Sequence, residues 1–100
     1  MEPVTAIQIV LSANLVNNAL LRSVFEAVAR KRSVKIRDLK DQFSSEQLEH
    51  SIPALKGADL IRESRAPIAD FSTLYVTENG LTAERALKDQ NLMDALTTRV

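Results

Sequence analysis

The sequence SSEQLEHSIPALKGADLI, residues 44–61, opens with the pattern of a helix N-terminus. Ser44 and Ser45 are residue types that accept hydrogen bonds at a helix start, and Gln47 stands three positions after Ser44, as a capping box requires. Apolar residues then recur at helical spacing: Leu48, Ile52 and Leu55. The spacing predicts a helix with one buried face, and it leaves the following residues toward solvent: Gln47, Glu49, His50, Ser51 and Ala54.

Two short runs rich in β-branched or aromatic residues follow this helix. They are Leu60–Arg65 (LIRESR) and Phe71–Val76 (FSTLYV), and the turn-prone segment APIAD separates them. This pattern predicts a β-hairpin. Upstream, we expect an extended piece at Ser33–Lys35 and a short helix at Ile36–Phe43. The predicted order is therefore helix, short strand, helix, helix and hairpin.

The chain from Leu20 to Leu87 resembles the winged-helix family of bacterial transcriptional regulators, of the multiple-antibiotic-resistance or PadR type. Three local patterns carry the resemblance. KIRDL is similar to the start of the family's supporting helix, residues 44–61 to its recognition helix, and VTENGLTAERAL to the opening of the helix after the wing. Two residues depart from the family: Asp59 stands where a glycine is usual, and Pro53 lies inside the recognition helix, where it removes an internal hydrogen bond.

The resemblance implies a mainly α fold with a small β-hairpin wing, an α+β winged helix with extra terminal helices. We expect one domain over residues 1–100, with an N-terminal dimerisation helix at 3–19, a winged-helix core at 20–76 and a C-terminal helix at 77–98 capped by Thr77. The implied function is a DNA-binding transcriptional regulator. It would act as a homodimer on a pseudo-palindromic site, with recognition helices about 34 Å apart in successive major grooves.

Candidate DNA contacts follow from this implied docking on double-stranded DNA. Base edges would meet Gln47, His50 and Ser51, and a glutamine is able to make a bidentate contact to adenine. Phosphates would meet cations around the supporting helix and on the first wing strand: Arg32, Lys35, Arg37, Arg62 and Arg65. Two alternatives stay open. The cations around the supporting helix (Arg32, Lys35 and Arg37) could belong to a solvated helix end, and the wing arginines could be paired with Glu63 or Asp70.

The charge pattern is divided between two kinds of partner: the basic residues around the start of the supporting helix favour DNA, whereas the zero net charge and the acidic recognition helix favour a protein. Lysine plus arginine equals aspartate plus glutamate, at 13 each, so the net charge gives no support to nucleic-acid binding. Cations outnumber carboxylates between Arg22 and Lys40, but the balance reverses between Asp41 and Glu63, which makes the expected recognition helix acidic. The alternative function is a winged-helix protein–protein interaction module without DNA binding.

Other residue types argue against catalysis and metal binding. The chain has no cysteine, which excludes disulfides and thiolate metal sites and fits a reducing cytoplasm. His50 is the single histidine and has no second ligand at metal-binding spacing, so no metal is expected. No catalytic triad spacing and no glycine-rich phosphate loop is present, and we expect neither an enzyme nor a cofactor.

The N-terminal segment is charge-free from Pro3 to Leu21 and mostly aliphatic. Gln8 and several asparagines interrupt it, and no cation precedes it, so we expect neither a membrane span nor a signal peptide. Its spacing indicates helix, although a strand over residues 4–12 and a break at the asparagines are left open. Its apolar residues exceed one helix face, which predicts a dimer interface that includes Ile7, Leu11, Leu15 and Leu96. Alternatively, the terminal helices fold back on one core.

Overall fold

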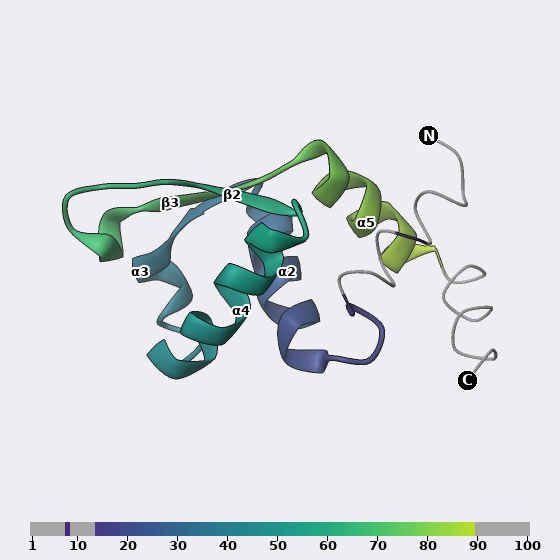
Figure 1. The fold of residues 1–100 in the computed structure, drawn as a ribbon, viewed down its shortest axis with the longest axis horizontal. Helices are drawn as coiled ribbons and strands as arrows, with labels where there is room; N and C mark the ends of the chain where they lie inside the picture. The colour runs from purple at the N-terminus through teal and green to yellow at the C-terminus, as the bar shows by residue number, and fades with distance from the viewer. Residues whose placement is uncertain (1–7, 9–13, 90–100) are drawn as a thin grey trace.

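The computed structural model describes Gln8 and residues 14–89. These residues form α-helices α2 (Ala19–Lys31), α3 (Ile36–Leu39), α4 (Ser45–Gly57) and α5 (Glu78–Lys88), strands β1 (Ser33–Lys35), β2 (Ile61–Ser64) and β3 (Thr73–Val76), and a 3-10 turn at Ala69–Phe71. The helices α2, α3 and α4 lie on one side of the strands, and α5 continues from the end of β3 (Figure 1). The expected α+β class is confirmed.

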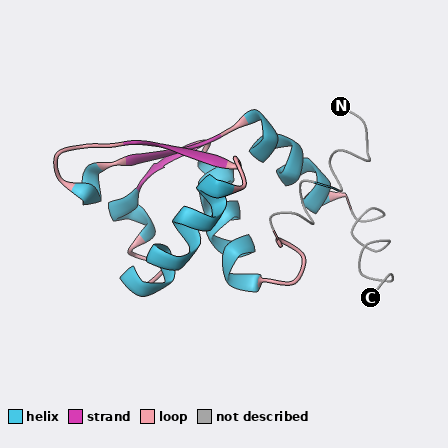
Figure 2. Cartoon of the chain, viewed as in Figure 1, coloured by secondary structure: helices cyan, strands magenta, loops and turns pink. Residues whose placement is uncertain are grey.

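The three strands form one antiparallel sheet in the order β1-β3-β2 (Figure 2). Leu74 stands opposite Val34 on one side and opposite Glu63 on the other, and Tyr75 stands opposite Ser33 and Arg62. Leu74 is buried while Tyr75 is 44% exposed, because neighbouring residues of a strand point to opposite faces. One face of the sheet therefore packs on the helices. We call the other the outer face, made of Ser33, Lys35, Arg62, Ser64, Thr73 and Tyr75.

The hydrophobic core lies between this sheet and the helices. Its fully buried large side chains come from α2, α3, α4, the link between α4 and β2, and the sheet: Phe25, Val28, Leu39, Leu55, Leu60, Ile61 and Leu74. Leu15 also belongs to this core, with 0% exposure. Its assignment to a dimer interface is therefore wrong, since the chain itself buries it. Ile7, Leu11 and Leu96 lie outside the described residues.

The single helix predicted over residues 3–19 is interrupted. Gln8 is helical, but Asn14–Asn17 form a turn, and Asn14 has a positive φ of 58°. Asn18 then caps a new helix, because its side-chain oxygen accepts a hydrogen bond from the Leu21 amide at 3.1 Å. The predicted break at the asparagines is confirmed, whereas the choice between helix and strand over residues 4–12 falls, apart from Gln8, outside the described residues.

Other boundaries differ from the expected ones for identifiable reasons. The expected helix Ile36–Phe43 ends at Leu39 and continues as a turn, although Phe43 still packs against the core. The expected C-terminal helix starts after its Thr77 cap but ends at Lys88, because Asp89 is extended. Pro53 does not end α4. It lies on the exposed side, where water is able to satisfy the carbonyl that proline leaves without a donor.

Candidate nucleic-acid interface

Helix α4 begins with the predicted capping box. The Ser44 Oγ accepts a hydrogen bond from the backbone N–H of Gln47 at 3.1 Å. The side-chain Oε1 of Gln47 in turn accepts one from the backbone N–H of Ser44 at 2.9 Å. The first turn is exposed, so the cap holds the helix start in a defined place on the surface. The solvent side of α4 carries Glu46, Gln47, Glu49, His50, Pro53 and Ala54.

The cap limits what Gln47 offers to a ligand. A bidentate contact to adenine needs the side-chain carbonyl as acceptor and the amide group as donor at the same time. The Gln47 carbonyl oxygen already accepts from the Ser44 amide. The Gln47 side chain therefore has only its NH₂ group free for a ligand. A bidentate contact to adenine would require Gln47 Oε1 to give up its hydrogen bond from the Ser44 backbone N–H.

Ser51 is not on the solvent side. It is 1% exposed, and its Oγ has no hydrogen-bond partner among the described residues. The residue lies three positions after Leu48 and next to Ile52, so a regular helix places it on the same buried face. Its assignment as a base-contacting residue is wrong.

His50 is exposed on α4, as expected. No group of three or more histidine, aspartate or glutamate side chains within the described part of the chain is placed to hold a metal ion. The exposed side chain of His50 lies on the solvent side of α4.

Two of the expected phosphate contacts lie together where β1 meets α3. The Lys35 Nζ is 5.9 Å and the Arg37 guanidinium carbon 5.4 Å from the ring centroid of Phe71. Arg37 is also 3.7 Å from an Asp38 carboxylate oxygen. Both cations are exposed, so they remain accessible to an anionic partner while Phe71 restrains their positions.

The β2–β3 loop is fixed to α3 beside these cations. The Ile36 amide donates to the Ser72 carbonyl at 3.0 Å, and Lys40 forms an ion pair with Asp70 at 2.6 Å. The Ser72 Oγ also accepts from the Ala66 amide at 3.0 Å, across the base of the loop. These bonds hold the hairpin against the helical part of the fold.

Arg32 is exposed, but its guanidinium is paired within the chain. Its Nη1 lies 2.7 Å from Glu84 Oε1 and donates to the Ala29 carbonyl at 2.9 Å. The Glu84 side chain is 10% exposed, so this pair neutralises a nearly buried carboxylate of α5. Arg32 thus joins α2 to α5, and its charge is already compensated.

The arginines of the hairpin differ from each other. Arg62 lies 3.8 Å from Asp59, whereas Arg65 follows β2, is exposed, and has no ion-pair partner among the residues that the structure describes. The suggested partners are occupied elsewhere. Glu63 forms an ion pair with Lys56 at 2.8 Å, and Asp70 forms one with Lys40. The alternative prediction that the wing arginines pair with Glu63 or Asp70 is therefore wrong.

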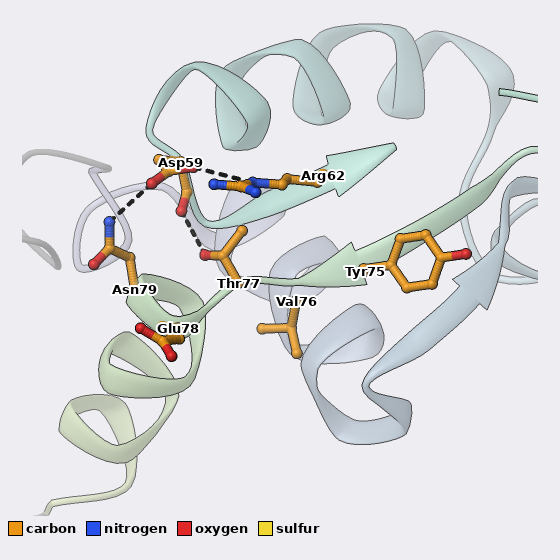
Figure 3. A pocket seen from close by; sticks show the side chains of 7 residues that line it. All are labelled: Asp59, Arg62, Tyr75, Val76, Thr77, Glu78 and Asn79. Atoms are coloured by element: carbon orange, nitrogen blue, oxygen red, sulfur yellow. Dashed lines mark hydrogen bonds and ion pairs between the residues drawn. The ribbon is translucent and has the colours of Figure 1, made fainter. Parts of the chain in front are cut away.

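Sequence reasoning missed a hollow at the end of the sheet, shown in Figure 3. Its volume is about 540 Å³, and it is lined by Asp59, Arg62, Tyr75, Val76, Thr77, Glu78 and Asn79. Arg62 extends along β2 toward Asp59, and Tyr75 lies farther along β3. The alternation in FSTLYV, with Leu74 and Val76 inward, was the signal that would have placed Tyr75 on the outer face.

Asp59 organises one end of this hollow. Its φ of 59° is left-handed, a conformation that glycine adopts more easily than other residues. The Thr77 hydroxyl donates to the Asp59 carbonyl, and the Asn79 side-chain amide donates to the Asp59 carboxylate at 3.0 Å. The strained residue is therefore held by the first turn of α5.

Comparison with known proteins adds no assignment. No family model, no curated protein and no solved structure matches the chain. Across the described residues, no helix has both the length and the apolar character to cross a membrane.

Proposed function

We propose that this chain is a DNA-binding transcriptional regulator with a winged-helix fold. One observation carries the proposal: the elements follow one another as α2-β1-α3-α4-β2-β3-α5, with the strands in the order β1-β3-β2. In this arrangement α3 and α4 form the helix-turn-helix, and β2, β3 and their loop form the wing. The exposed, capped start of α4 supports its role as the helix that enters a groove.

The charges support phosphate contacts beside α4 rather than on it. Lys35 and Arg37 stand at the start of α3, and Arg65 follows the first wing strand. Glu46 and Glu49 on α4 repel phosphates, so affinity must come mainly from the wing side. Base contacts would come from His50 and from the Gln47 NH₂ group, both of which suit acceptor atoms such as guanine O6 and N7.

A charge reversal at Arg37 tests this proposal. Arg37→Glu should weaken binding to all duplex sequences alike and reduce the salt slope of log K by about 0.9 for each phosphate that the variant no longer neutralises. Arg85→Glu is the matched control, because Arg85 is an exposed arginine of α5 without an ion pair in the described structure. The measurement is fluorescence anisotropy of a labelled duplex at several salt concentrations. Equal effects of both variants would contradict the proposed orientation.

The proposed regulator acts as a homodimer on a pseudo-palindromic site. This part rests on the sequence, in which the charge-free segment 4–16 carries more aliphatic residues than one helix face buries. Burial of Leu15 within the chain removes one of them from the interface. Ile7, Leu11 and Leu96 remain the proposed contacts.

A second candidate function is a protein–protein interaction module. The observation that favours it is the acidic solvent side of α4, where Glu46 and Glu49 are exposed without ion pairs in the described part of the chain. Acidic surfaces suit basic protein partners better than phosphates. This candidate predicts no binding to random duplex DNA even at low salt.

A further inference from the structure

The outer face of the sheet presents exposed aromatic and cationic side chains next to each other. Tyr75 is 44% exposed in the middle strand and stands directly opposite Arg62 of β2. Phe71, at 43% exposure, precedes β3, and its ring lies against Lys35, which belongs to the same face. Each of these two exposed rings thus has a cation beside it.

Large exposed apolar side chains are concentrated in this region. In the described residues the set consists of Ile68, Phe71 and Tyr75, all from one short segment that contains β3. Scattered exposed apolar residues need no explanation, but Phe71 and Tyr75 both lie beside cations of the outer face, which indicates a binding site. The neighbouring cations select an anionic partner with flat apolar groups.

We propose that the outer face of the sheet binds single-stranded nucleic acid. Unpaired bases would stack on Tyr75, and the adjacent cations Arg62 and Lys35 would contact the phosphates. A duplex does not suit this face, because its bases are stacked on one another and closed to the rings. The proposal goes beyond the proposed function, since it uses a different face from α4 and a different form of nucleic acid.

The hollow beside Tyr75 adds a preference among bases. Glu78 is exposed there without an ion pair in the described structure, and Asn79 and Asp59 lie next to it (Figure 3). Carboxylates accept hydrogen bonds from exocyclic amino groups, such as the N4 amino group of cytosine. Thymine lacks an amino group. The geometry therefore favours cytosine over thymine at this position.

The two surfaces share Lys35, so the test must use a residue that only the outer face contains. Tyr75 is that residue, because it points away from the helices on β3. Tyr75→Phe keeps the stacking ring and removes the hydroxyl, while Tyr75→Ala removes the ring. The far-ultraviolet circular dichroism spectrum of each variant shows whether the fold is kept.

The experiment measures anisotropy of labelled twelve-residue oligodeoxycytidylate, oligodeoxythymidylate and a random duplex with the full chain at low salt. We expect deoxycytidylate to bind more tightly than deoxythymidylate. Tyr75→Ala should weaken binding of the single strand about tenfold or more, whereas Tyr75→Phe retains it and neither changes duplex affinity. Single-strand binding that depends on Tyr75 supports this inference whether or not the duplex binds. Absence of duplex binding would contradict only the proposed function.

Three results would overturn the inference. The first is absence of single-strand binding by the wild-type chain, which would leave the outer face to a protein partner. The second is a folded Tyr75→Ala variant with unchanged affinity for the single strand. The third is an equal loss of duplex and single-strand binding in that variant, since the outer face would then belong to the duplex site.

Discussion

At the scale of single residues, Gly80 is the glycine that leaves no space for a side chain, in contrast to Gly57. A Cβ built there would overlap the carbonyl oxygen of Leu60 and the side chain of Val76. The close approach brings the first turn of α5 against the link between α4 and β2. Gly57 is the opposite case, because a Cβ there would meet nothing within 4 Å and the residue has no positive φ.

This contrast gives a matched pair of glycine substitutions. Gly80→Ala should lower the free energy of unfolding by about 1–3 kcal/mol, because backbone must shift to admit the methyl group. Gly57→Ala should leave stability unchanged or raise it by up to about 1 kcal/mol, since alanine is the better helix former. Urea denaturation of both variants measures the difference. A Gly80→Ala protein as stable as Gly57→Ala would contradict the described packing.

At the scale of elements, the start of α4 depends on the Ser44 cap. Ser44→Ala removes the acceptor for the Gln47 amide and should cost about 1 kcal/mol of unfolding free energy. Ser45→Ala is the control, because Ser45 is exposed as the first residue of the helix and alanine suits that position. Thermal unfolding followed by circular dichroism measures both, and equal melting temperatures would show that the cap is not formed in solution.

Helix starts were predictable because caps are local. The spacing of Ser44 and Gln47 identified α4, and Thr77 identified α5. The end of the helix after Ile36 was not predictable, because Phe43 reaches the core from a turn as well as it would from a helix. Ser51 was misplaced because a polar residue was assumed to face water, although its position in the helix period put it beside Leu48.

The candidate site was only partly predictable for a related reason. The cations were visible in the sequence, but their partners depend on tertiary structure. Arg32 pairs with Glu84, which is 52 positions away, and no local pattern predicts that contact. The exposed ring of Tyr75 followed from strand alternation, but the hollow beside it required the placement of Asp59 against the start of α5.

At the scale of the whole molecule, the proposed homodimer has a direct test. Leu11→Glu should place two charges in a two-fold interface, since each chain contributes one, and should produce monomers. Light scattering measures the mass, and circular dichroism checks that the helical domain persists. Leu15→Glu is a contrasting variant, because Leu15 is fully buried in the core, and its expected effect is unfolding. A wild-type mass of one chain at tens of micromolar would contradict the dimer.

The central claim is that this fold binds double-stranded DNA. The most direct measurement is the affinity of the wild-type chain for a random duplex as a function of salt concentration. We expect binding that weakens linearly on a log–log plot, with a slope of about −0.9 for every phosphate neutralised. We expect a slope of about −3 per chain, because each chain has three proposed phosphate-contacting cations: Lys35, Arg37 and Arg65. Absence of binding at low salt, or an affinity independent of salt, would contradict the claim and favour the protein-interaction module.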